Sequence, residues 1–252
     1  DWNELIYSEL LHLINNPGVL VTKVTEEASI QSVRNTITIF NKAWFSDCKE
    51  KILQNYSKLV SKEEGFFFIS SYLPLLKDLK LQLNLGQFPT IWHTQLSQKF
   101  EVNPQSREWG LSDGLVDDDF TKIINILIPK FIPRAYLEGY ATLIKSGVKR
   151  GWPERPKCIF TSNAYFSYDA FKAWTAEKSE QGAKLIIGQH GGNFGVSPFS
   201  FFEEHQVKIA DKWLSWGWDD PERPQITPIS NLKTIGETVH YDPTGDALMV
   251  GF

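Results

Sequence analysis

The sequence predicts an α/β fold in which a Rossmann-like parallel sheet is flanked by helices. Three short apolar segments, residues 158–163, 184–188 and 211–218, have the length and composition of buried strands. Helical patterns at residues 168–178 and 203–210 separate them. Strands that alternate with helices favour parallel pairing, because each helix returns the chain across a face of the sheet.

The first half of the chain contains further helices and one more strand. Apolar residues at helical spacing predict helices at residues 2–14, 45–60, 72–85, 120–128 and 131–145, and residues 66–69 form a short apolar strand. The leucines of the 72–85 helix are too dense for a surface helix, so we expect them to line the core between layers. Residues 19–40 mix β-branched runs with polar residues and are strand or irregular.

The segment 86–119 is the least regular and ends in an acidic cluster. The cluster contains the carboxylates of Asp113, Asp117, Asp118 and Asp119. They can act as catalytic groups or metal ligands, or they can cap the helix that follows. We favour the cap, because acidic side chains are stabilised at the positive end of a helix dipole. Farther along, Glu138 stands on an aromatic and aliphatic segment and is expected to be solvated.

Composition narrows the class of protein. With 252 residues and 42% hydrophobic content, the chain can bury a sizeable core. A net charge of −4, with no basic run, argues against nucleic acid as a partner. Cys48 and Cys158 are far apart and suggest neither a disulfide framework nor a zinc site, which favours the cytoplasm. The longest apolar run, residues 123–132, is interrupted by polar residues, so no segment is expected to span a membrane.

The stretch 184–195 is the strongest candidate for a functional loop. A strand stops at Gly188 and is followed by Gln189, His190 and three more glycines at 191, 192 and 195. Glycines let the backbone adopt positive φ and approach a ligand closely, leaving amide groups to face an anion. His190 would stand at the rim of that site. The alternative is a tight turn whose histidine hydrogen-bonds to the backbone.

The predicted topology brings three polar strand ends together. In open parallel sheets, ligands bind outside the carboxyl ends of the strands. Residues 161–163, 188–192 and 215–217 are such ends, and we expect them on one edge of the sheet. Ser162 and Asn163 would present polar groups to a ligand there, if they do more than finish a strand.

After residue 218 the composition changes. Residues 219–246 are rich in proline and charge and are predicted to be an interdomain linker. Residues 247–252 are apolar and predict the first strand of a second α/β domain. We therefore expect residues 1–218 to form the first domain of a longer chain.

The same residues carry a resemblance to a known family. In the second half of the chain, the motifs are residues 159–163, residues 171–174, Gly188 to Gly192 with Gly195, Glu204-His205, and Asp211 followed by residues 214–218. Two upstream segments agree with the same family: residues 83–89 with Trp92, and residues 132–140. Together they resemble a family of bacterial transferases found in surface-polysaccharide and O-antigen gene clusters. Members resemble GT-B glycosyltransferases, in which two Rossmann-like domains face each other across a cleft. They are similar to enzymes that transfer Kdo or related acidic sugars from CMP donors.

The resemblance implies an N-terminal, acceptor-side half of such an enzyme, with the nucleotide bound mainly through the second domain. Its substrates would be a nucleotide sugar and a glycan or lipid-linked glycan acceptor, with no separate cofactor and no metal. The expected location is the cytoplasm, at the inner face of the membrane through peripheral association.

Glycosyl transfer needs a proton acceptor or a nucleophile and stabilisation of the departing phosphate. The candidate catalytic residues are His190, Glu204 and Asp211. The candidate substrate-binding residues are Ser162, Asn163, Gln189, Gly191, Gly192 and His205. Helix capping by the glutamates at 203 and 204, and a structural turn at Asp211, are the alternatives.

Other classes fit less well. A metal hydrolase lacks compact ligand spacing, because no His-Glu-x-x-His motif occurs. A serine hydrolase lacks a Gly-x-Ser-x-Gly elbow. A non-catalytic sugar- or nucleotide-binding module remains as the alternative, because tryptophan-rich surfaces stack on sugars.

Overall fold

The structure is a computed structural model that describes residues 6, 9, 10, 13, 39–93, 100–110, 118–191, 193–238, 240 and 243–245, with only the backbone for 39–49. Its centre is a sheet of five parallel strands in the order β1-β2-β3-β4-β5. The strands are β1 (Phe66–Ile69), β2 (Cys158–Thr161), β3 (Lys184–Gly188), β4 (Lys212–Trp216) and β5 (Ile226–Ile229). The predicted α/β, Rossmann-like parallel fold is confirmed.

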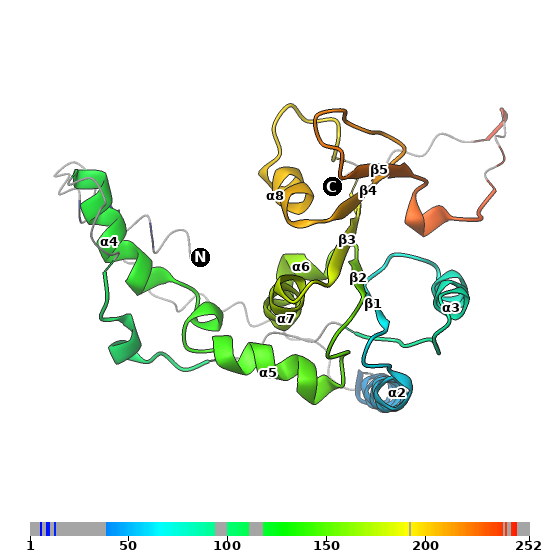
Figure 1. The fold of residues 1–252 in the computed structure, drawn as a ribbon, viewed down its shortest axis with the longest axis horizontal. Coiled ribbons are helices and arrows are strands. Elements are labelled where there is room, and N and C mark those ends of the chain that lie inside the picture. The colour runs from blue at the N-terminus through cyan, green and yellow to red at the C-terminus, as the bar shows by residue number, and fades with distance from the viewer. Residues whose placement is uncertain are drawn as a thin grey trace.

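The described part contains seven α-helices. They are α2 (Ile39–Val60), α3 (Leu75–Asn84), α4 (Asp119–Phe131), α5 (Tyr140–Arg150), α6 (Ala164–Ser167), α7 (Asp169–Glu180) and α8 (Phe201–Ile209). Most of them lie around the sheet, whereas α4 lies away from it (Figure 1). In Figure 1 the sheet is seen nearly edge-on, with α6, α7 and α8 on one side and α3 on the other. Each crossover from β2 to β4 steps to the next strand in the same direction, so right-handed connections place their helices on one face.

The main core lies between the sheet and α7. Phe67 and Trp174 are almost fully buried, and their ring centroids are 4.7 Å apart. Helix α5 packs on α7 through Gly147, where a Cβ would come within 2.4 Å of the Trp174 ring. The glycine therefore allows the close approach that covers this side of the core.

The opposite face carries a smaller cluster, and one prediction fails there. Phe68, Phe160 and Leu232 form that cluster. The leucines of α3 do not line the core: Leu76 is 78% exposed, and the buried residue of the helix is Gln82. Gln82 turns inward because it bonds to Thr90, Gln87 and Asp78, which tie the helix to the loop that follows it.

Around α4, the favoured cap is confirmed and the solvated glutamate is wrong. Asp118 accepts a hydrogen bond from the Thr121 amide at 2.8 Å and so caps α4. Glu138 is buried against Arg107, with Oε1 2.7 Å from Nε and Oε2 2.8 Å from Nη2. Arg107 also donates to carbonyl groups at the end of α4, so the pair joins the 100–110 segment to α4. The helix predicted over 131–145 is instead a 3₁₀ turn at Arg134–Tyr136 followed by α5.

The segment predicted as a linker contributes to the sheet. Strand β5 lies within residues 219–246 and pairs in parallel with β4. The predicted strand at 247–252 lies outside the described residues. A domain boundary at residue 218 and a second domain from 247 stay predictions.

Candidate functional site

Strands β1 to β4 end side by side at the carboxyl edge of the sheet. Ile69, Thr161 and Ile187 are in register across β1, β2 and β3. Just beyond them, the Ser162 amide donates to the Ser70 carbonyl at 2.9 Å. The Gln189 amide donates to the Leu214 carbonyl at 2.8 Å. The predicted convergence of the strand ends on one edge is confirmed.

His190 follows β3 at this edge and is surrounded by aromatic rings. Its ring centroid is 5.2 Å from that of Phe194, 6.2 Å from Tyr165 and 6.3 Å from Tyr72. The side chain is half-buried, and its Nδ1 atom is buried without a hydrogen-bond partner among the described residues. Buried polar atoms are nearly always paired, so this nitrogen is a candidate contact for a ligand.

The surroundings of His190 favour the neutral form of its imidazole. Burial lowers the pKa of the side chain, a backbone hydrogen bond with Ser162 raises it, and the charge of Lys233 lowers it again. The net direction is downward from 6.5. A neutral imidazole near pH 7 can accept a proton.

Tyr72 has an unusual backbone conformation beside His190. Its φ is +63°, and Ser70 two residues earlier has a φ of +48°. Positive φ is uncommon outside glycine and tends to occur at functional sites, where the surrounding structure holds it. The Tyr72 hydroxyl accepts a hydrogen bond from Asn163 Nδ2 at 2.9 Å, which connects the ends of β1 and β2.

Gln189 holds the loop that carries His190. Its Oε1 accepts from the Trp216 amide at 2.8 Å and from Trp218 Nε1 at 3.1 Å. Its Nε2 donates to the Gly191 carbonyl at 2.7 Å. The side chain is 2% exposed, so it connects the end of β3 to the end of β4 and is not free to bind a substrate through its oxygen.

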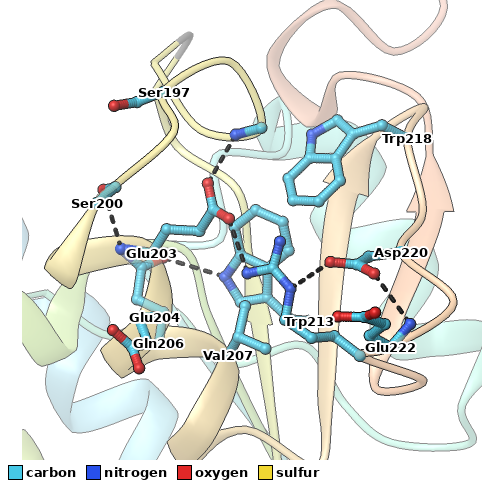
Figure 2. Close-up of polar contacts among 12 residues, drawn as sticks. Ser197, Ser200, Glu203, Glu204, Gln206, Val207, Trp213, Trp218, Asp220 and Glu222 are labelled. Atoms are coloured by element: carbon cyan, nitrogen blue, oxygen red, sulfur yellow. Dashed lines mark hydrogen bonds and ion pairs between the residues drawn. The ribbon is translucent and has the colours of Figure 1, made fainter.

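A second set of contacts fixes the far part of the same loop (Figure 2). The buried Glu203 carboxylate accepts from the Gly195 amide at 2.7 Å and pairs with Arg223 at 2.9 Å. Arg223 also pairs with Asp220 at 2.6 Å. Gly195 has a φ of +78°, and a Cβ there would lie 2.6 Å from the Trp218 ring. The Gly195 amide, expected to be free to face the anion of a ligand, is instead engaged by the Glu203 carboxylate.

A cavity of about 390 Å³ lies elsewhere, at the end of α4. Its basic lining residues are engaged: Arg107 binds Glu138, Lys130 pairs with Glu9, and Arg134 donates to the Phe100 carbonyl. These charges hold the fold together locally, so we place the candidate site at the carboxyl edge and not in this cavity.

Comparison with known proteins identifies the class. A model that describes LIC12162 family transferases matches residues 1–252. The chain belongs to the LIC12162 family of transferases. Neither a curated protein nor a solved structure matches this transferase. Within the described residues, no helix is long and apolar enough to cross a membrane, and no three His, Cys, Asp or Glu side chains are grouped to hold a metal ion.

The structure places some predicted substrate-binding residues of the transferase at the site and uses others elsewhere. Asn163 is half-buried beside Tyr72. Ser162 is fully buried and donates to the Ser71 carbonyl at 3.0 Å, so its hydroxyl is already engaged. Gly191 lies next to His190 and is half-buried, whereas Gly192 lies outside the described residues.

Three other predicted residues of the transferase do not gather around His190. Glu204 and His205 are exposed on α8, and Glu204 pairs with Lys208 at 2.6 Å. Asp211 precedes β4 and therefore lies at the amino edge of the sheet, about 16 Å from the carboxyl edge at about 3.3 Å per strand residue. There it pairs with Lys184 at 2.8 Å and accepts from the Leu185 amide at 2.9 Å. Asp211 therefore connects the beginning of β3 to the beginning of β4.

Several residues at the edge were missed. Tyr72 and Tyr165 gave no signal, because nothing in the sequence distinguishes a tyrosine with positive φ or one that faces a histidine. Lys233 lies in the supposed linker. Glu203 was detectable: it is buried together with Gln206 and Val207, and positions i, i+3 and i+4 share one helix face.

Proposed function

We propose that this transferase is a glycosyltransferase of bacterial surface-polysaccharide biosynthesis, acting in lipopolysaccharide O-antigen or capsule assembly. The donor is a nucleotide sugar, Kdo-like and activated by CMP, and the acceptor is a glycan or lipid-linked glycan. The proposal is supported by membership of a transferase family and by the motifs that resemble polysaccharide transferases. No separate cofactor is required, because the donor is itself activated.

The observation that carries the proposal is the state of His190. The imidazole is half-buried at the carboxyl edge, its pKa is lowered by burial, and its Nδ1 has no hydrogen-bond partner among the described residues. In the proposed reaction it takes the proton of the acceptor hydroxyl while that oxygen attacks the anomeric carbon of the donor. The bond from this carbon to the phosphate oxygen breaks, and CMP leaves with the bonding electrons.

The neighbours of His190 have the chemistry that sugars require. Tyr72, Tyr165 and Phe194 present aromatic rings around it. Asn163 offers an amide oxygen, since its nitrogen already donates to Tyr72. Ring faces pack against sugar C–H groups, and amides bind hydroxyls, so these residues would orient the acceptor relative to the base.

An apolar surface near the glycine loop supports a place at the inner face of the membrane. Exposed phenylalanines gather on and before α8 and on α6: Phe166, Phe199, Phe201 and Phe202. The rings of Phe166 and Phe202 are 5.4 Å apart, so residues from two elements form one patch. Exposed apolar patches mark interaction surfaces, and this one suits the lipid part of a lipid-linked acceptor.

Turnover of a defined donor tests the proposal. The intact protein is incubated with CMP-Kdo and a lipopolysaccharide or capsule glycan, and both CMP release and the mass of the glycan are measured. The expected result is CMP release that depends on the acceptor, together with a glycan one Kdo residue heavier. Binding of CMP-Kdo without turnover would contradict transfer and favour a non-catalytic sugar- or nucleotide-binding module.

A further inference from the structure

Lys233 stands beside the candidate site, although it comes from the supposed linker. It lies on the 3₁₀ helix Leu232–Thr234, and its Nζ is 4.5 Å from the centroid of the Tyr72 ring. The same Tyr72 ring is 6.3 Å from that of His190. The ammonium and the imidazole therefore share one aromatic neighbour at the carboxyl edge.

Packing defines the position of Lys233. Leu232 is 6% exposed and packs with Phe68 and Phe160. A Cβ on Gly188 would come within 2.8 Å of Leu232 Cδ1, so the glycine at the end of β3 makes room for this contact. The Asn231 side chain accepts from the Lys233 amide at 2.9 Å. The backbone before the ammonium is thus anchored to the sheet.

Within the described residues, no acidic side chain neutralises the charge of Lys233. No carboxylate among the described residues pairs with it, and its ammonium lies over the aromatic face of Tyr72. The side chains around His190 are likewise aromatic or amide: Tyr72, Tyr165, Phe194 and Asn163. A cation held over a ring, beside an unpartnered histidine nitrogen and without a counter-ion, is complementary to an anion.

We propose that Lys233 binds the anionic group of a substrate at this site, a phosphate or a sugar carboxylate. The inference rests on the proposed function, because it assigns a substrate group to the same site. The ammonium forms an ion pair with an oxygen of that group and keeps its cation–π contact with the ring of Tyr72. No bond is made or broken in this step.

Binding of three probes to the intact protein tests the assignment. Calorimetry is performed with CMP, which carries a phosphate, with free Kdo, which carries a carboxylate, and with cytidine, which carries neither. In Lys233→Met we expect the affinity for CMP or for Kdo to fall about 10- to 100-fold, since a hydrogen bond to a charged group is lost. A fall for CMP identifies the phosphate, and a fall for Kdo identifies the carboxylate. Cytidine affinity should not change.

Two further variants separate position from charge. Lys212→Met removes the same charge at the amino edge, where Lys212 starts β4, and should leave all three affinities as in the wild type. Lys233→Arg should restore anion binding. Melting temperatures confirm that each variant is folded.

Two results would overturn the assignment. One is equal affinity of the wild type and Lys233→Met for both CMP and Kdo, and the other is a wild type that binds neither anion. Failure of the proposed function looks different. If CMP-Kdo is not turned over but anion binding depends on Lys233, transfer of Kdo is wrong and the anion site stands.

Discussion

The carboxylate of Glu203 lies 2.9 Å from the guanidinium of Arg223, measured from Oε1 to Nη1. Glu203 is on α8 and Arg223 precedes β5, so the pair joins the two segments that follow β3 and β4. The other carboxylate oxygen accepts from Gly195, and Arg223 holds Asp220 as well. This set of contacts, drawn in Figure 2, fixes the loop that begins with Gln189 and His190.

Replacing Glu203 with Gln should destabilise the protein by about 1–3 kcal/mol, because a buried group loses a charged partner and its amide cannot accept from both Gly195 and Arg223. Urea denaturation measures the change. The matched control is Glu204→Gln, whose exposed pair with Lys208 is screened by solvent, so this variant should unfold at nearly the same urea concentration as the wild type. Equal losses in the two variants would show that the buried contacts do not hold the loop.

Replacing Gln189 with Ala should leave the Trp216 amide and Trp218 Nε1 without their acceptor. We expect a loss of at least about 1 kcal/mol in unfolding free energy, since both donors lie at a largely buried junction. Faster hydrogen exchange at the Trp216 amide reports the broken contact directly. Unchanged exchange at that amide would mean that the side chain does not connect β3 to β4 in solution.

The lowered pKa of His190 predicts a pH dependence of stability. In the folded state the group binds its proton more weakly than in the unfolded chain, whose pKa is about 6.5. Stability is therefore unaffected by His190 above about pH 6.5 and declines as the pH falls from there to the folded pKa. Between pH 7.5 and 5, the wild type should lose more unfolding free energy than His190→Gln. Parallel losses would indicate that the imidazole is not desolvated.

The carboxylates give a second pH dependence, in the acid range. Four carboxylates have lowered pKa values because a cationic partner favours the ionised form: Glu138 with Arg107, Glu204 with Lys208, Asp211 with Lys184 and Asp220 with Arg223. For Asp211, burial acts in the opposite direction and is outweighed by the contacts with Lys184 and the Leu185 amide. Each contributes stability above its unfolded pKa near 4, which is lost only as the pH falls toward the lowered folded value.

Asp211 should prove structural. Asp211→Asn removes the pair with Lys184 and weakens the contact with the Leu185 amide, so we expect a small loss of stability, about 0.5–1 kcal/mol, for this partly exposed pair. Sugar transfer by the variant should stay within about twofold of the wild type. A loss of transfer of a hundredfold or more in a folded Asp211→Asn protein would return Asp211 to the catalytic residues.

The sheet was predictable from the sequence because its strands are short apolar runs with helices between them. Parallel order then follows from the handedness of the crossovers. Strand β5 was not predictable: Ile226–Ile229 contains a proline and follows a charged turn, and it is a strand because it pairs with β4 at the edge of the sheet. The prediction that the α3 leucines line the core was wrong, because a high proportion of apolar residues in a helix does not show which side chains face the sheet.

The site was predictable only in part. The position of His190 at the carboxyl edge was predictable because the residue follows a buried strand directly, whereas its role stays a prediction. Asp211 and Glu204 were chosen for residue type, but a residue before a parallel strand lies at the opposite edge, and Glu204 is one position off the buried helix face. The partners that surround His190 come from residues 72, 165, 194 and 233, and tertiary packing alone brings them together.

The central claim is that His190 takes the acceptor proton, and sugar transfer by His190→Ala in the intact protein tests it most directly. General bases contribute about 10²–10⁴-fold in rate, so we expect transfer to fall by that factor while a cooperative melting transition remains. His190→Gln, which fills more of the space among the three rings, should be equally inactive and closer to the wild type in melting temperature. Near-wild-type transfer by either variant, with reduced stability, would contradict the claim and make His190 a structural residue of the loop.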